Sequence, residues 1–187
     1  MDWTRIVSFD LSFSGLGWAE HCLVTDRLSY DVCAPFREKS KSGDLHYECQ
    51  RLSYLLNFVK ARVDPQSLVI VEDFAFARAN QAHQLGGLGY LVRFWLWQQN
   101  ISYLTVAPSM LKKFVSGKGN APKQVMLKDV FRVFGIDVWD DNVADAIGLN
   151  FIGRSLAGSH SPTNATQRAV VAELKKKYAG ILEPERF

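Results

Sequence analysis

The segment that most constrains the fold is Ser67–Glu72, with the sequence Ser-Leu-Val-Ile-Val-Glu. Leu68–Val71 is aliphatic without a polar interruption, which is typical of a β-strand buried on both faces. Such strands lie in sheets that are covered by helices on both sides. The segment also ends on Glu72, although a carboxylate is costly to bury. The sequence therefore predicts an α/β sheet in which an inner strand carries a carboxylate to the sheet edge.

Patterns of apolar residues, caps and breakers predict the remaining elements. The expected strands, besides Ser67–Glu72, are Arg5–Phe9, Gly15–Leu23, Leu28–Ala34 and Ile101–Val106, and short turns favour an antiparallel arrangement of the first three. The expected helices run from the cap Asp44 to Val63, from Ala79 to Gln99, from Pro108 to the loop Gly117–Pro122, from there to Gly135, from Asp140 or Asp141 to Gly158, and from Ala165 to Tyr178. We expect a mixed five-stranded sheet flanked by helices, with residues 1–158 as one domain and 159–187 as a linker and a short basic helix.

Positive charge is concentrated in the middle of the chain, although the whole sequence has a net charge of only +3. Residues 74–134 contain eight Lys or Arg residues and one acidic residue, Asp129. A basic region on an otherwise acidic chain is typical of a polyanion-binding face. A solvated helix surface is the alternative interpretation.

The sequence favours a cytoplasmic protein. No apolar run approaches the roughly 18 residues that a membrane span needs. The start, Met-Asp-Trp-Thr-Arg, lacks the basic and apolar regions of a signal peptide. Cys22, Cys33 and Cys49 are odd in number and show no C-x-x-C spacing, so we interpret them as buried, reduced thiols.

Three acidic residues occupy positions where an acid is unfavourable. Asp10 ends the first strand, Glu72 ends the buried strand, and Asp145 lies between two alanines in the last core helix. If the two strands are neighbours, their carboxylates lie close together, and Asp141 shares a helix face with Asp145. Converging carboxylates repel one another, which a divalent metal would relieve, and all-oxygen ligands favour Mg²⁺ or Mn²⁺. Individually, Asp10 could begin a turn, Glu72 could end a strand, and Asp140 or Asp141 could cap a helix.

Five segments in the same order resemble the RuvC group of Holliday-junction resolvases, within the ribonuclease H-like nucleases. They are "IVSFDLSFSGLGWA", "VIVEDF", "FARANQAHQLGGLGYLV", "KKFVSGKGNAPKQV" and "DDNVADAIGL", and they extend from about residue 5 to residue 157. The chain departs from the family at Asn142, where the family usually has an acid or a histidine. Asp141, one residue earlier, is the alternative fourth ligand. The segment after Glu72 is also about one residue shorter than the bacterial pattern.

The resemblance implies an Mg²⁺- or Mn²⁺-dependent endonuclease with two ions per site, which cuts four-way DNA junctions as a homodimer and needs no nucleotide cofactor. It implies that Asp10, Glu72, Asp145 and Asp141 bind metal and that Lys123 faces the scissile phosphate. The implied DNA contacts are Phe74 or Phe76 as a wedge at the junction, and Arg78, Lys112, Lys113 and Lys118 beside the phosphates.

Three other functions are compatible with parts of this pattern. A structure-tolerant nuclease acting on flaps and other branched DNA would use the same residues. An actin-like or sugar-kinase-like ATPase also begins with a similar Asp and Gly spacing, but that fold needs two halves, for which this chain is too short. A DNA-binding module without nuclease activity is disfavoured by the three acids, and Asn142 is the residue in its favour.

Overall fold

The computed structural model describes residues 3–13, 15–34, 45–73 and 82–183. A five-stranded sheet with the order β3-β2-β1-β4-β5 forms its centre. The first three strands, β1 (Arg5–Asp10), β2 (Leu16–Cys22) and β3 (Arg27–Cys33), are antiparallel neighbours. Strand β4 (Ser67–Glu72) is parallel to β1, and β5 (Tyr103–Val106) is parallel to β4. The mixed five-stranded sheet expected from the sequence is confirmed.

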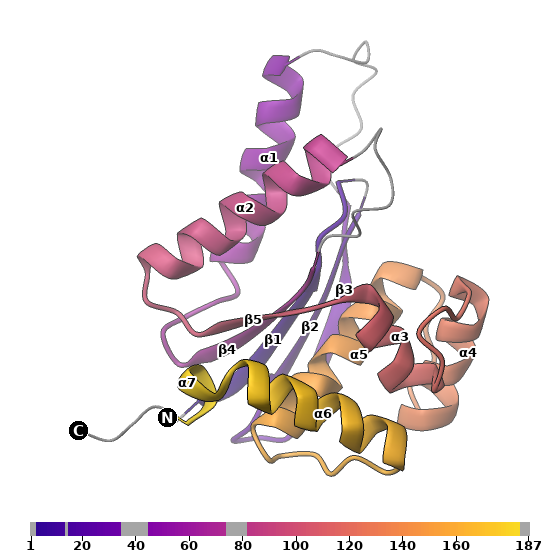
Figure 1. The fold of residues 1–187 in the computed structure, drawn as a ribbon. Helices are drawn as coiled ribbons and strands as arrows, with labels where there is room; N and C mark the ends of the chain where they lie inside the picture. Colours follow the sequence, from indigo (N-terminus) through magenta and orange to yellow (C-terminus); the bar gives the residue numbers. More distant parts are fainter. Residues whose placement is uncertain (1–2, 14, 35–44, 74–81, 184–187) are drawn as a thin grey trace.

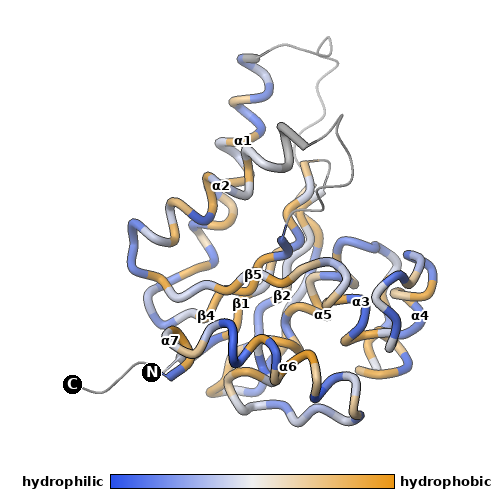
Figure 2. Tube along the Cα trace, viewed as in Figure 1, coloured by the Kyte–Doolittle hydropathy of each residue, from blue (hydrophilic) through white to orange (hydrophobic). Residues whose placement is uncertain are grey.

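Helices cover both faces of this sheet (Figure 1). One face packs against α1 (Leu45–Lys60) and α2 (Ala82–Gln98). The other face packs against α3 (Pro108–Ser116), α4 (Lys123–Phe134), α5 (Asp141–Leu156) and α6 (Ala165–Lys177), and the short α7 (Ala179–Leu182) follows α6. Hydrophobic residues dominate the central strands β1 and β4 in Figure 2, as expected for strands covered on both sides.

Alternation along the central strands divides the apolar side chains between two cores. Val69 and Val71 of β4 pack with α1 and α2, whereas Leu68 and Ile70 pack with α3 to α6. Successive strand residues point to opposite faces, so a continuous apolar run supplies both cores at once. Ser67–Glu72 is therefore the doubly covered strand that its sequence predicts.

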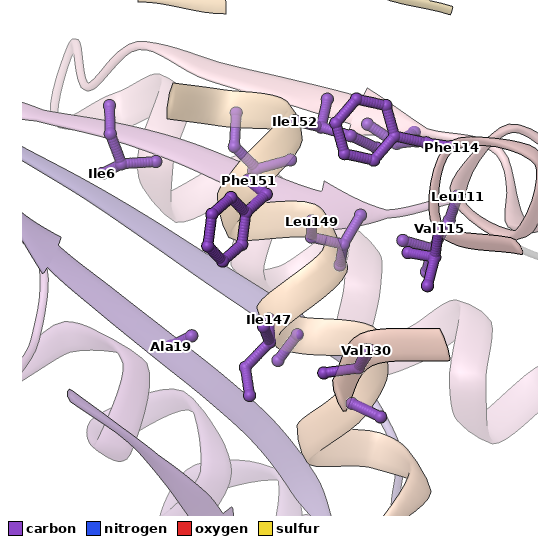
Figure 3. Close-up of a cluster of buried hydrophobic side chains, with 14 of the residues drawn as sticks. Ile6, Ala19, Leu111, Phe114, Val115, Val130, Ile147, Leu149, Phe151 and Ile152 are labelled. Atoms are coloured by element: carbon purple, nitrogen blue, oxygen red, sulfur yellow. The ribbon is translucent and has the colours of Figure 1, made fainter. Parts of the chain in front are cut away.

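Helix α5 lies against the sheet more closely than an ordinary helix can. A Cβ at Gly153 would lie 2.6 Å from Ile6 and 2.7 Å from Ile70, and one at Gly148 would lie 2.7 Å from Leu111 and Val115. Figure 3 shows Ile147, Leu149, Phe151 and Ile152 of this helix among side chains of β1, β2, α3 and α4. Gly153 lets side chains of β1 and β4 approach the helix axis, and Gly148 lets side chains of α3 do so, which fixes α5 between the sheet and α3.

Several boundaries differ from the expected ones. Helix α1 ends at Lys60 and not at Val63, because residues 61 and 62 form a turn. Helix α5 ends at Leu156, and Gly158 adopts a positive φ of 81° two residues later. The expected cap Asp44 and the expected start of α2 at Ala79 lie outside the described residues.

The carboxy-terminal helix packs onto the main core. Asn164 caps α6 by accepting a hydrogen bond from the Gln167 amide, and Val170, Val171 and Leu174 join the core cluster. Tyr178 then binds the edge strand β5, since its hydroxyl donates to the Thr105 carbonyl at 2.8 Å and accepts from the Thr105 amide at 3.1 Å. The Tyr178 side chain thereby binds the amide and carbonyl of an edge strand that could otherwise pair with another strand.

The prediction of three buried thiols is only partly right. All three cysteines are free, but Cys33 is buried, Cys22 is half-buried and Cys49 is exposed. Cys49 lies on the outer side of α1, where helical spacing alone does not distinguish the edge of an apolar stripe from its centre. Across the ranges that the structure describes, no helix is long and apolar enough to cross a membrane.

Candidate metal centre

Two of the predicted acids lie side by side because two parallel strands end together. Phe9 of β1 pairs with Val71 of β4, so the next residues, Asp10 and Glu72, lie next to each other at the carboxyl ends of these two strands. Ile6 and Ile70 pack in the core beneath α5, and strand alternation places Asp10 and Glu72 on that same face. The carboxyl ends of adjacent parallel strands are a common position for functional groups.

Helix α5 brings the third acid over this edge. Asp140 is its N-cap, and its side chain accepts hydrogen bonds from the amides of Asn142 at 2.9 Å and Val143 at 3.1 Å. Asp145 follows one turn later, and carboxylate oxygens of Asp10, Glu72 and Asp145 lie within 4.8 Å of one another. The sequence left open whether Asp140 or Asp141 caps the helix, and the structure assigns the cap to Asp140.

Polar contacts in the core hold α5 in this position. The Ser8 hydroxyl donates to the Ala146 carbonyl at 2.7 Å, and the Asn150 amide donates to the carbonyls of Ile6 at 3.0 Å and Ala19 at 3.1 Å. All these contacts are buried, so each stabilises one alignment of the helix over β1 and β2. Ser8 and Asn150 were not among the residues predicted from the sequence, although each is a polar residue inside an apolar strand or helix.

Gly17 completes this alignment. It pairs with Asp10 across β1 and β2, and a Cβ at this position would lie 2.0 Å from the Asn142 carbonyl oxygen. The first turn of α5 therefore touches the β2 backbone directly, and no larger residue fits between them. This contact places the first turn of α5, and hence Asp145, above Asp10.

The three carboxyl groups lie where ionisation is unfavourable. Burial and then the neighbouring Glu72 raise the pKa of Asp10 well above its usual value, and the two groups share a hydrogen bond. Burial raises the pKa of Glu72 to about 7, with a further contribution from Asp145. Burial and the charge of Asp10 raise the pKa of Asp145 to about 7 as well. Bringing these groups together in ionised form therefore requires a compensating cation.

One unsatisfied atom points to the same requirement. Asp145 Oδ1 is buried and has no hydrogen-bond partner within the described part of the chain. Buried polar atoms nearly always have a partner, and exceptions often mark a site for an ion or water. A set of carboxylate oxygens with an unused lone pair is the ligand chemistry of Mg²⁺ or Mn²⁺, so the residues fit a divalent metal ion.

Two lysines lie within electrostatic range of the acids. Lys123 lowers the pKa values of Asp10, Glu72 and Asp145, and Lys112 lowers those of Glu72 and Asp145, although burial outweighs both effects. Lys123 is at the start of α4, and Lys112 is in α3. These helices therefore bring positive charge to the acidic edge from the side opposite to α1 and α2 (Figure 1).

The predicted fourth ligand is engaged with one of these lysines. Asp141 forms an ion pair with Lys123, and it lies outside the cluster formed by the other three acids. Asn142 has its amide nitrogen beside Gly15, 3.5 Å from where a Cβ would be. The choice between Asp141 and Asn142 as a ligand therefore stays a prediction.

The remaining predicted DNA contacts fall into two groups. Lys113 and Lys118 are exposed, one on α3 and one in the loop that follows it, where a phosphate backbone can reach them. Phe74, Phe76 and Arg78 lie outside the described residues. Lys112, Lys113 and Lys118 stay predicted phosphate contacts.

Curated proteins that are similar in sequence to this chain include RuvC nucleases. The chain is 26% identical over 122 residues to the crossover junction endodeoxyribonuclease RuvC of Rickettsia conorii. The aligned residues cover 65% of this chain and 77% of that protein. The RuvC of Rickettsia rickettsii matches to the same extent. No protein-family profile matches the chain.

Solved structures give the same result for the fold. Thermus thermophilus RuvC superposes with a TM-score of 0.56 at 17% identity, covering 83% of this chain and 97% of that one. The Thermus thermophilus RuvC in complex with a Holliday junction superposes with a TM-score of 0.58 at 16% identity and the same coverage. The RuvC-like resemblance is thus confirmed, and the fold is the ribonuclease H-like fold of RuvC.

Proposed function

We propose that this protein is a metal-dependent endonuclease that cuts phosphodiester bonds in four-way DNA junctions. The observation that carries the proposal is the convergence of Asp10, Glu72 and Asp145 within 4.8 Å at one sheet edge of a RuvC-like fold. Similarity to crossover junction endodeoxyribonucleases and to a RuvC that was solved with a Holliday junction supports the choice of substrate.

The acids would act as ligands of two Mg²⁺ or Mn²⁺ ions. Bound metal ions of this kind activate the attacking water and stabilise the leaving oxygen of a phosphodiester. Asp10 is the most buried of the three acids and would bind the metal together with the other two. Glu72 and Asp145 flank it from β4 and α5, and Asp141 or Asn142 would complete the set beside Asp145.

The lysines near the acids would hold the DNA backbone. Lys123 is 71% exposed and within range of all three carboxylates, so a scissile phosphate seated on the acids would meet its ammonium group. Positive charge at that point offsets the negative charge that develops in the transition state. Lys112, Lys113 and Lys118 would contact further phosphates without reading the base sequence.

A homodimer would supply two such sites to a junction with two-fold symmetry. The aromatic residues of α2 support this proposal, because its outer side exposes Tyr90, Leu91, Phe94 and Trp97 while Leu88, Val92 and Leu96 face the core. Exposed apolar residues that recur at helical spacing form a surface suited to a second helix. Trp97→Asp should shift the sedimentation mass from two chains toward one, and wild-type protein sedimenting as a single chain with junction DNA would contradict the dimer.

Cleavage of a synthetic four-way junction tests the function directly. Wild-type protein should cut paired strands at the branch with Mg²⁺ and should be inactive with a chelator. Asp10→Asn should abolish cleavage but leave junction binding largely intact, because affinity comes mainly from lysine contacts with phosphates. Asp129→Asn is a matched control, because it also removes a buried carboxylate, one that pairs with Arg132 in α4. Wild-type activity in Asp10→Asn would contradict the metal site.

The same assay separates the alternative of a structure-tolerant nuclease. If the enzyme recognises any branched DNA, flaps of the same sequence are cut at rates comparable with the four-way junction, and linear duplexes are cut much more slowly. A rate on the four-way junction at least ten times higher than on the flap would support a resolvase.

A further inference from the structure

Trp139 is the most exposed of the large hydrophobic residues in the described part of the chain, with 88% of its surface accessible. Single exposed apolar residues are common on proteins, so exposure alone carries no function. The position of this side chain distinguishes it, since it lies in the loop between α4 and α5, directly before the helix that carries Asp145.

The residues on both sides of Trp139 fix the backbone of the loop that exposes its side chain. Gly135 ends α4 with a positive φ of 72°, and residues 136–139 form neither helix nor strand, with a bend at Trp139 just before the N-cap Asp140. Val138 is buried with 8% of its surface exposed, whereas Trp139 is exposed to solvent. The buried valine and the helix cap therefore fix the backbone on both sides of the tryptophan.

The indole is close to the acids along the chain. Asp140 and Asp145 are five residues apart along the helix, so the Cα atoms of Trp139 and Asp145 lie at most roughly 12 Å apart. This length corresponds to between about three and four base steps of B-form DNA at 3.4 Å each. Lys123, which pairs with Asp141 on the first turn of α5, brings positive charge to the same edge.

We propose that Trp139 stacks on an unpaired or loosened base of the bound branched DNA, within a few nucleotides of the cut, and so helps to position the scissile phosphate. The proposal rests on the nuclease function proposed above. An indole stacks on any base because every base has a π-face, and unstacking costs least where the duplex is already interrupted. The ring should therefore favour branched DNA over linear duplex and should be indifferent to base sequence.

Binding should be measured in the Asp145→Asn background, so that the junction stays uncut. Trp139→Ala and Trp139→Leu should weaken binding to the four-way junction by about 5- to 150-fold, as expected for the loss of one stacked base, and should weaken binding to linear duplex much less. Trp139→Phe should retain most of the affinity, since it keeps an aromatic face while Trp139→Leu keeps only apolar surface. Tyr30→Ala is the control, because it removes an exposed ring from β3 on the far side of the sheet from β5.

A base analogue locates the contact. A junction with 2-aminopurine beside the branch should lose fluorescence on binding the protein with Trp139 and should keep it with Trp139→Leu. Equal affinities for Trp139→Leu and Trp139→Phe would overturn the stacking role and leave the nuclease function intact. A shift of Trp139→Ala from dimer to single chain would instead make the residue a subunit contact and overturn the proposal. If the 2-aminopurine fluorescence is quenched but the wild-type protein cuts no junction, Trp139 stacks on a base and the proposed nuclease function is wrong.

Discussion

Asp145→Asn should stabilise the metal-free protein while destroying its activity. Asp145 is buried beside two other carboxylates, and its Oδ1 has no partner in the described part of the structure. Burial and the charge of Asp10 raise its pKa from the usual 3.8 to about 7. An asparagine has the same shape but no charge, so it removes the repulsion and the desolvation of an ion together.

The size and pH dependence follow from the pKa shift. A difference of about three pKa units corresponds to at most roughly 4 kcal/mol of destabilisation in the ionised wild type, at 1.36 kcal/mol per unit. Protonation of Asp10 or Glu72 relieves part of it, so we expect about 2 kcal/mol, or a rise in Tm of roughly 4–8 °C. Folded Asp145 keeps its proton up to about pH 7, whereas the unfolded chain releases it near 3.8. Wild-type stability therefore falls as pH rises through this interval, and the advantage of the variant is complete above pH 7 and absent below pH 4.

Urea denaturation with a chelator at pH 4, 5.5 and 8 measures this advantage, and the same series with Mg²⁺ supplies the second half of the test. Metal that binds only the folded state stabilises the wild type by an amount that grows with the logarithm of the metal concentration relative to Kd, whereas the variant has lost a ligand. The difference in the free energy of unfolding between Asp145→Asn and wild type should therefore become smaller or change sign at pH 8 when Mg²⁺ is added. A variant that is less stable than wild type in chelator at pH 8, or a stability difference that does not depend on pH, would contradict an unfavourable buried charge at Asp145.

Three further changes test the surroundings of the site. Asp141→Ala should reduce junction cleavage far more than Asn142→Ala, because a carboxylate is the better metal ligand; the reverse order in a cleavage assay would make Asn142 the ligand. Gly17→Ala should lower the free energy of unfolding in urea by about 1–3 kcal/mol, since its Cβ would meet the Asn142 carbonyl at 2.0 Å. Gly86→Ala is the control, because its Cβ meets no atom within 4 Å and the free energy of unfolding should stay equal or rise. Phe76→Ala should slow cleavage of four-way junctions with metal binding unchanged, and an unaltered rate would remove this residue from the mechanism.

The sequence was sufficient for the fold because its strongest patterns are local. The apolar run Ser67–Glu72 predicted a doubly covered strand, and the alternation of Leu68 and Val69 between two cores is the reason that the run has no polar residue. Helix ends were less predictable, since the last turn of α1 unwinds at residue 61 although its apolar spacing continues to Val63. Such spacing describes a buried stripe and does not describe where hydrogen bonding stops.

The site was predictable only where strand ends determine it. Asp10 and Glu72 follow directly from two strands that the sequence marks, whereas the pairing of Lys123 with Asp141 joins residues 18 apart through a loop whose path no local pattern describes. Asp140 and Asp141 are both acceptable caps by type, and only the backbone at Asp140 distinguishes them. Ser8 and Asn150 bind backbone carbonyls of distant elements, and a contact of that kind depends on the packed structure.

The crowding of acids at the start of α5 thus separates into three physical roles. Asp140 satisfies free amides of the first turn and lies where the helix dipole favours negative charge. Asp141 is partly exposed and is compensated by Lys123, so it adds little cost. Asp145 alone is turned into the buried edge beside Asp10 and Glu72, where its charge is opposed by burial. Repulsion there acts to push α5 off the sheet, and the contacts that resist it are those of Gly17, Ser8 and Asn150. A helix that is held in place against this repulsion keeps Asp145 close to Asp10 and Glu72 before any metal binds, which is the preorganisation that the proposed metal-assisted cleavage would use.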